Sequence, residues 1–186
     1  MKTRSAMLIL SLLAVSAALG REDIAITATK KTLDERKGGE QDLWRGTSRS
    51  LEKTIYYDIE ITVWSPAVPL DVKVEWLILI EGAGGRLFPG TFGEKSIGLA
   101  LGQPLTMPTE PVKLEGREWT GGPNPGTVQD RVAGYAVRVL STDGKVLAEK
   151  YEPVSVKGDA DWSLLDEGRT GTRTGPPARR SPLRRP

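Results

Sequence analysis

The sequence predicts an all-β protein, an immunoglobulin-like β-sandwich of about seven strands. Several segments alternate apolar and polar residues with a period of two, as strands with one buried face do. Glycine and proline are abundant, at 21 and 13 of the 186 residues, which is typical of chains with many turns. Between residues 21 and 167 no helical pattern is long enough for a β-α-β unit, so a parallel sheet is not expected.

The first part of the predicted domain contains one short strand and then a polar stretch. Residues 24–28 alternate apolar and polar side chains, so we expect a strand there. Residues 30–50 are mostly polar, and we expect one helical turn that begins at Thr32, because Glu35 follows three residues later. No strand is predicted in this polar stretch.

The second and third strands give the clearest signals. In residues 53–65 the odd positions are apolar and the even positions polar, until Pro66 ends the strand. Residues 71–81 repeat the pattern with the buried side chains at even positions, and Trp76 is predicted to lie in the core. The predicted inward sets are Ile55, Tyr57, Ile59, Ile61 and Val63 in the second strand, and Val72, Val74, Trp76, Ile78 and Ile80 in the third.

Shorter strands and two loops are predicted next. Residues 82–93 are expected to form a glycine-rich loop. Prolines confine the strand pieces between residues 97 and 114 to a sheet edge. Residues 115–130, which include the run GGPNPG, are expected to form a second loop.

A hairpin closes the predicted domain. Residues 131–141 and 144–156 are two apolar-rich strands separated by Asp143 and Gly144, a pair typical of tight hairpin turns. In immunoglobulin topology the strand of residues 131–141 pairs with the strand of residues 71–81.

The first 20 residues have the features of a secretory signal segment. Lys2 and Arg4 precede an apolar run from residue 6 to residue 19, and small residues follow it. Cleavage is expected after Ala18 or after Gly20, and the pattern does not decide between them. The run is shorter than a bilayer span, and a retained anchor is the alternative. We therefore expect an extracytoplasmic protein, either periplasmic or secreted.

Residues 168–186 have the composition of a disordered tail. They include six arginines, four prolines and no acidic residue. The signal segment carries +2 and the tail +6, so with a total of +2 the domain of residues 21–167 carries −6. A basic tail on an acidic domain is expected to contact an anionic surface, such as lipid headgroups, acidic polysaccharide or nucleic acid without sequence specificity. A tail that folds back on its own domain, or that is simply solvated, is the alternative.

Catalysis is not expected. The chain has no cysteine and no histidine, which excludes Cys/His zinc sites, cysteine nucleophiles and histidine-based triads. Asp58 and Glu60 are spaced like an acid/base pair, about 6.6 Å along a strand, but are predicted to be surface charges. The acidic group around Trp162, namely Asp159, Asp161, Asp166 and Glu167, lacks the glycine and the spacing of a calcium loop. We predict no catalytic residue, no cofactor and no metal site.

Five strand segments carry a resemblance to a known group of proteins. They are YYDIEIT at residues 56–62, DVKVEW at residues 71–76, PVKL at residues 111–114, GYAVRV at residues 134–139 and DGKVLAE at residues 143–149. Over residues 53–151 the chain resembles small secreted bacterial proteins with an immunoglobulin-like fold, one branch of which is associated with type IV pilus assemblies. The resemblance implies a bacterial, exported protein and brings no catalytic residues; the basic tail is not part of it.

The outer face of the third strand is the predicted partner surface. Leu77 and Leu79 point away from the core side of that strand, and Ala136 and Leu140 of the sixth strand, residues 131–141, are expected beside them. An apolar outer face indicates contact with another protein. The alternative is an intramolecular cover formed by residues 30–50 or 83–93.

Tryptophans outside the core offer a second reading. Trp44, Trp64, Trp119 and Trp162 lie in predicted loops or at strand ends, where they would form a sugar-stacking platform or cover the ends of the sandwich.

The leading expectation is a non-enzymatic protein-interaction module, accessory to an envelope or pilus-type assembly, with an unidentified protein partner in the cell envelope. The alternative is a carbohydrate-binding module.

Overall fold

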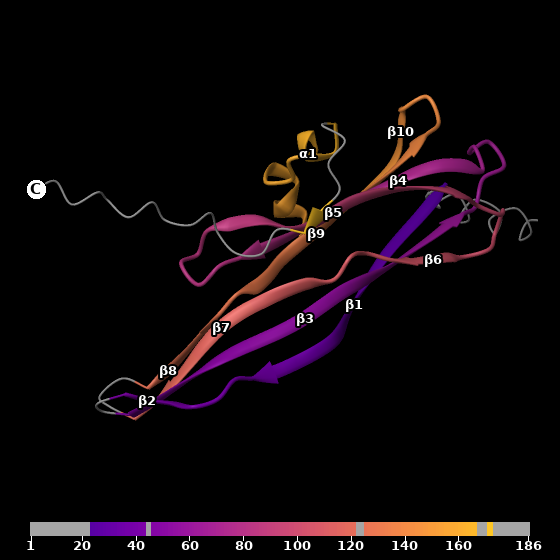
Figure 1. Ribbon diagram of the computed structural model, residues 1–186. Helices are drawn as coiled ribbons and strands as arrows, with labels where there is room; N and C mark the ends of the chain where they lie inside the picture. The colour runs from indigo at the N-terminus through magenta and orange to yellow at the C-terminus, as the bar shows by residue number, and fades with distance from the viewer. Residues whose placement is uncertain (1–22, 44–45, 122–124, 167–170, 173–186) are drawn as a thin grey trace, which may run out of the picture.

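The computed structural model describes residues 23–43, 46–121, 125–166 and 171–172. They form two antiparallel β-sheets packed face to face, with very little helix (Figure 1). The predicted all-β, immunoglobulin-like sandwich is confirmed, although the described residues contain eleven strands instead of about seven. Within the described ranges, no helix is both long and apolar enough to cross a membrane.

Sheet A contains the first strands of the chain. Its order is β1-β3-β7-β8, and β2 and β6 also pair with β3. The molecule is elongated, and β2 and β8 lie together at one tip (Figure 1, lower left). The strands are β1 (Ile24–Lys37), β2 (Gln41–Leu43), β3 (Gly46–Val63), β6 (Leu105–Pro108), β7 (Val112–Thr120) and β8 (Gly126–Gln129).

Sheet B has the order β10-β9-β4-β5-β11. The predicted pairing of the third strand with the sixth is confirmed, because β4 pairs with β9 from Val72 to Glu81. The hairpin turn at Asp143 and Gly144 is also confirmed, and Gly144 has φ 85°, a value that favours glycine. The strands are β4 (Asp71–Glu81), β5 (Leu87–Gly98), β9 (Arg131–Ser141), β10 (Val146–Glu152) and β11 (Gly171–Thr172).

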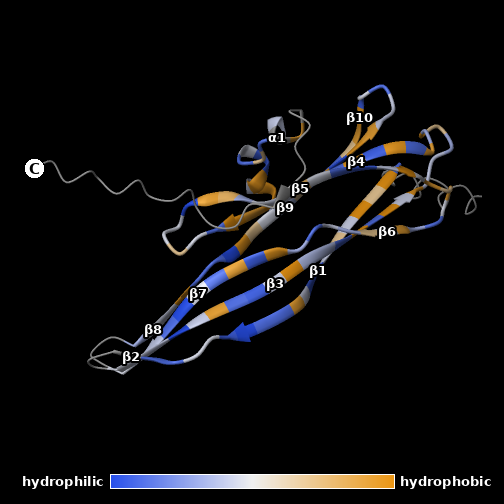
Figure 2. Cartoon of the chain, viewed as in Figure 1, coloured by the Kyte–Doolittle hydropathy of each residue, from blue (hydrophilic) through white to orange (hydrophobic). Residues whose placement is uncertain are grey.

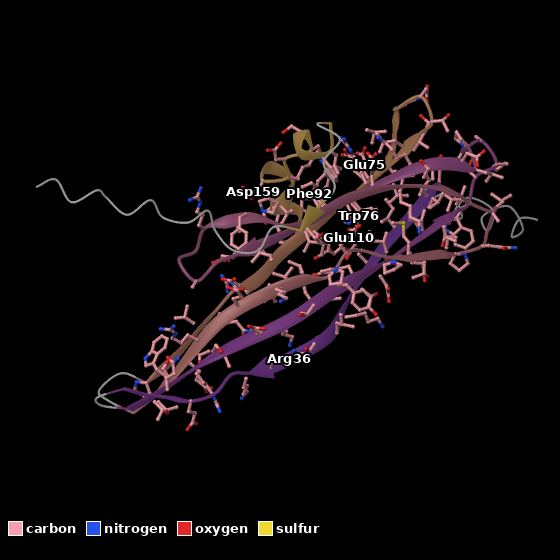
Figure 3. All side chains as sticks on the ribbon, in the orientation of Figure 1. Arg36, Glu75, Trp76, Phe92, Glu110 and Asp159 are labelled. Atoms are coloured by element: carbon pink, nitrogen blue, oxygen red, sulfur yellow. The ribbon has the colours of Figure 1, made fainter. Side chains whose placement is uncertain are left out.

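The core lies between the two sheets and matches the predicted inward positions. Every member of the two inward sets is buried, at 7 % exposure or less. Trp76 lies in the middle of this core, and its Nε1 donates a hydrogen bond to Glu110 Oε2 at 3.2 Å (Figure 3). Gly93 lies opposite Trp76 on β5, where a Cβ would come within 2.6 Å of the indole ring. The glycine therefore makes room for the tryptophan.

Three segments predicted as irregular are strands instead. Residues 30–37 continue β1, because β3 supplies a pairing partner and Lys53 Nζ lies 3.0 Å from Glu35 Oε2 across the pair. No helical turn forms at Thr32. The predicted loop of residues 82–93 is a tight turn followed by β5, and the loop of residues 115–130 is the hairpin of β7 and β8.

Asp130 marks the point at which the chain passes from one sheet to the other. β8 pairs with β7 in sheet A, and β9 begins one residue after Asp130 in sheet B. The Asp130 backbone N–H donates to the Glu115 carbonyl at 2.8 Å, and the Asp130 carboxylate accepts from the Glu115 N–H at 3.3 Å. These two hydrogen bonds hold the crossing strand against β7.

The two ends of the chain lie largely outside the described residues. The predicted signal segment, residues 1–20, is not among them. Of the predicted disordered tail only residues 171–172 are described, and they form β11 on the edge of β5. Sheet B therefore continues past residue 167, the predicted end of the domain.

Candidate functional site

The outer face of sheet B carries the four residues predicted as a partner surface. Leu77 and Leu79 of β4 belong to an apolar cluster separate from the main core. Ala136 lies beside Leu77 on β9, and Leu140 lies opposite Lys73. The structure thus brings these side chains to one sheet face, as the strand pattern predicted.

That face is nevertheless covered by the chain itself. After β10 the chain crosses the outer face as η1 (Val154–Gly158) and α1 (Ser163–Asp166), and β11 then joins the opposite edge of the sheet. We call residues 153–166 the strap. Val156, Ala160, Trp162 and Leu165 of the strap pack in one cluster with Leu77, Leu79, Phe92 and Ala136 (Figure 3).

The prediction that this face is exposed is therefore wrong. Leu77 is 1 % exposed, and Leu79, Ala136 and Leu140 are also buried. The cover comes from neither of the two segments considered in the sequence, although Phe92 contributes from β5. It comes from residues predicted to be the end of the last strand and an acidic loop, because the apolar residues of the strap are too widely spaced to show a pattern.

A buried ionic group holds the strap on the sheet. Glu75 is 1 % exposed on the same outer face (Figure 3) and accepts a hydrogen bond from the Arg138 guanidinium. The Cζ atom of Arg138 lies 4.4 Å from the centre of the Trp162 ring, a cation–π arrangement. Since a buried carboxylate is costly without a partner, Arg138 satisfies Glu75 and anchors Trp162 at the same time.

Lysines complete the charge pairing around the strap. Lys73 Nζ lies 2.7 Å from Glu75 Oε1 and 3.3 Å from Glu94 Oε2, and the hydrogen bond to Glu75 raises the pKa of Lys73. Lys157 of the strap lies 3.6 Å from Glu149 and 5.3 Å from the centre of the Tyr151 ring.

Asp159 and Asp161 of the predicted acidic group around Trp162 lie in the strap. Asp161 Oδ1 accepts a hydrogen bond from the Ser163 N–H at 3.1 Å, which forms a turn just before α1. Asp159 is exposed (Figure 3), and Glu167 lies outside the described residues. In the described part of the chain, no three potential metal ligands gather in one group.

The three described tryptophans of the predicted sugar platform are not brought together. Trp44 lies outside the described residues. Trp64 follows the last residue of β3, whereas Trp119 pairs with Ser48 near the first, about 50 Å away at the usual rise along a strand. Trp162 belongs to the strap and packs against the outer face of sheet B. The described residues form no common flat surface from these side chains.

The remaining motifs lie on the surface. Asp58 and Glu60 are on the outer face of sheet A, opposite Thr29 and Thr27 of β1. Residues 82–85 form the turn between β4 and β5, where the Gly85 N–H donates to the Gly82 carbonyl at 2.8 Å.

One exposed apolar surface was not predicted. Trp64, Leu70 and Leu101 are 39, 45 and 50 % exposed at the end of the sandwich opposite β2 and β8. Leu101 bridges to Val63 beside Trp64, and the Leu70 carbonyl accepts a hydrogen bond from the Leu99 N–H at 2.7 Å. We call these three residues and their surroundings the apolar end.

The apolar end is built from three charge-free stretches. Residues 24–29, 61–70 and 96–109 contain no charged side chain, in a chain of which 27 % is charged. Figure 2 shows the same division along sheet A, with hydrophobic residues toward this end of β1 and β3 and hydrophilic ones toward the tip. These charge-free runs were the signal in the sequence that could have predicted the apolar end. They are far apart in the chain and come together only when the strands pair.

Two hollows accompany this end of the molecule. One, of about 320 Å³, lies between β1 and β10 and is lined by Asp23, Ile24, Ile26, Leu147, Ala148, Glu149 and Lys150. The other, of about 470 Å³, lies beside the start of β4 and is lined by Asp71, Val72, Lys73, Ser96, Ile97, Gly98, Ser141, Thr142 and Gly144.

Comparisons with known proteins give only distant likenesses. No protein-family model matches the chain, and no curated protein matches it. SoR45, a Northeast Structural Genomics Consortium target, is 11 % identical with a TM-score of 0.31, and the match covers 69 % of this chain and 85 % of that one. A crystal structure from Akkermansia muciniphila is 9 % identical with a TM-score of 0.26, and the match covers 84 % and 81 %.

Proposed function

We propose that this chain is a non-enzymatic protein-interaction module that works outside the cytoplasm, as an accessory of an envelope or pilus-type assembly. The observation that carries this proposal is the apolar end. It exposes a tryptophan and two leucines at one end of the sandwich, and exposed apolar patches mark interaction sites, whose buried centres are enriched in aromatic residues.

The surroundings of the apolar end support contact with a protein. Prolines at positions 66, 69 and 104 stiffen the loops that carry the exposed side chains, so little conformational entropy is lost on binding. The strap already covers the other large apolar face of the described residues. We therefore propose Trp64, Leu70 and Leu101 as the contact surface, in place of Leu77 and Leu79.

Capture of an envelope partner tests this proposal. The chain from residue 21 to residue 186 is immobilised and exposed to envelope extract, beside a variant carrying Trp64→Ser, Leu70→Ser and Leu101→Ser. The variant is expected to lose the captured partner at least tenfold, because the interface centre is removed.

The matched control is Leu33→Ser with Val154→Ser. These side chains are 62 and 76 % exposed elsewhere on the molecule, and the control should retain the partner. Equal retention by all three proteins would rule out the apolar end, and loss from the control alone would place the contact elsewhere.

We propose an anionic surface as a second contact, made by the basic tail. Truncation after Thr172 keeps β11 and removes five of the six tail arginines. The truncated chain should leave anionic vesicles at a lower salt concentration than the full chain, since such binding is electrostatic. Equal salt dependence of the two proteins would exclude the tail.

A further inference from the structure

The edge of sheet A changes character half-way along β1. β1 is the first strand of the sheet and pairs with β3 alone among the described strands. Its second half carries Lys30, Lys31, Arg36 and Lys37, and the pairing with β3 shifts register between Thr32 and Asp34. Edge lysines and bulges of this kind prevent pairing with another chain. The first half, residues 24–29, has none of these protections.

The unprotected half has backbone groups that face away from β3. The Trp64 N–H donates to the Asp23 carbonyl at 2.8 Å, so residues 23 and 64 form a hydrogen-bonded pair. In an antiparallel ladder such pairs alternate with pairs that make no backbone hydrogen bonds to each other. The N–H and C=O groups of Ile24 and Ile26 therefore point toward the open edge.

A groove lies along this open edge. It measures about 320 Å³ and is bounded by Ile24 and Ile26 on β1 and by Leu147 and Ala148 on β10, the edge strand of the other sheet. The Ala28 backbone, farther along this half of β1, hydrogen-bonds with the Tyr135 hydroxyl, and burial is the main cause that raises the pKa of Tyr135. The groove thus offers backbone partners and a mixed lining over a short strand length, in which four apolar residues stand beside Asp23, Glu149 and Lys150.

The charges around the groove favour a basic occupant. Asp58 and Glu60 stand on the outer face one strand in from the edge, behind the short side chains of Thr29 and Thr27. Asp23 lines the groove, and within the described residues none of these three carboxylates makes an ion pair. Lys150 is the one basic side chain of the lining, and Glu149 already faces Lys157.

We propose that a partner protein adds a β-strand to residues 24–29 of β1, and that this strand alternates apolar and basic side chains. The apolar side chains enter the groove between β1 and β10, and the basic ones extend over Thr27 and Thr29 to Asp58 and Glu60. Strand addition of this kind takes affinity from main-chain hydrogen bonds and specificity from alternate side chains. This inference rests on the proposed function and names the partner segment that the apolar end receives.

Peptide binding tests the proposed occupant. The probe is an end-capped octapeptide that alternates valine with lysine, titrated into the chain of residues 21–186 and followed by amide hydrogen exchange. Binding should slow exchange of the Ile24 and Ile26 amides at least tenfold, because these N–H groups become hydrogen-bonded. A peptide with valine and glutamate, or one with a proline at its centre, should bind at least tenfold more weakly.

Variants locate the site. Asp58→Lys with Glu60→Lys should weaken binding of the valine–lysine peptide at least tenfold. Glu52→Lys is an exposed change on β3 opposite Arg36, beside the protected half of β1, and should leave binding within twofold. Ala148→Arg should block the groove. Equal binding to all of these variants, or binding without protection of Ile24 and Ile26, would overturn the proposal.

Two further outcomes separate this inference from the proposed function. In one outcome, the variant with Trp64, Leu70 and Leu101 replaced loses the envelope partner, but the Asp58→Lys/Glu60→Lys and Ala148→Arg variants still bind it. That result supports the proposed function and contradicts strand addition. If the chain dimerises and Ala148→Arg abolishes the dimer, the occupant is a second copy of this chain, which also overturns the proposal.

Discussion

The guanidinium of Arg138 lies 4.4 Å from the centre of the Trp162 ring, so one side chain of sheet B holds one side chain of the strap. The same guanidinium donates a hydrogen bond to the buried carboxylate of Glu75. Arg138 therefore joins a charge inside the apolar outer face to the segment that covers it. The packing of the strap on the sheet and the charge pairing of the buried Glu75 carboxylate therefore both depend on Arg138.

Replacing Arg138 should expose this dependence. Arg138→Met leaves Glu75 with Lys73 as its remaining partner and removes the contact with Trp162, and we expect a loss of about 3 kcal/mol in the free energy of unfolding. Urea denaturation measures it. Glu75→Gln with Arg138→Met should cost less than the sum of the single changes, because the uncompensated charge is gone. A single variant within about 0.5 kcal/mol of the wild type would contradict the role of Arg138.

Charge under the strap should destabilise the domain. Leu77→Asp with Leu79→Asp places two carboxylates in an apolar contact that water does not reach, which costs several kcal/mol. Thermal unfolding and limited proteolysis of residues 153–166 report the effect. Leu33→Asp, at a leucine that is 62 % exposed, is the control and should change stability by less than about 0.5 kcal/mol. A double variant as stable as this control would mean that the strap does not cover the face in solution.

Trp76 should be a major contributor to stability. Trp76→Ala removes the largest side chain of the core and its hydrogen bond to Glu110, and we expect a loss of about 3 to 5 kcal/mol. Trp76→Phe keeps most of the packing and should cost less. Denaturation midpoints of the two variants that coincide with that of the wild type would show that the tryptophan is not packed between the sheets.

Stability should fall at alkaline pH through Tyr57. Burial, with the neighbouring Tyr135 as a second cause, raises the pKa of Tyr57 to about 12, whereas in the unfolded chain it lies near 10. The folded state therefore binds the proton more tightly, and the stabilisation is complete below pH 10 and lost as pH rises from about 10 to about 12. The loss should be roughly 2 to 3 kcal/mol. Urea midpoints measured across this range should decline less for Tyr57→Phe, and an unchanged decline would assign the effect to other groups.

Local pattern was enough to predict the strands of the core. The alternation in residues 53–65 and 71–81 specified which side chains face inward, and the Asp143–Gly144 pair specified a hairpin, because both signals depend on neighbours within one strand or turn. The bounds of β4 and β9 coincide with the predicted strands. Trp76 could be placed in the core for the same reason.

Pairing partners decided what local pattern could not. Residues 30–37 and 115–120 are mostly polar, with Leu33 and Trp119 as their large apolar side chains, and they become strands because β3 supplies a pairing partner. No feature within either segment shows that partner. The same holds for the apolar end, where three charge-free stretches meet only after the strands have paired.

The sequence by itself determined an all-β sandwich, its inward side chains and an apolar outer face at Leu77 and Leu79. Only the tertiary structure decided that this face is covered and that another surface is exposed. The reason is physical: burial of an outer face depends on where a distant segment such as the strap packs, and its four apolar contacts are spread over irregular backbone. The strap residue Leu165 and the sheet residue Leu77 are 88 positions apart in the sequence and join one apolar cluster only in the folded chain.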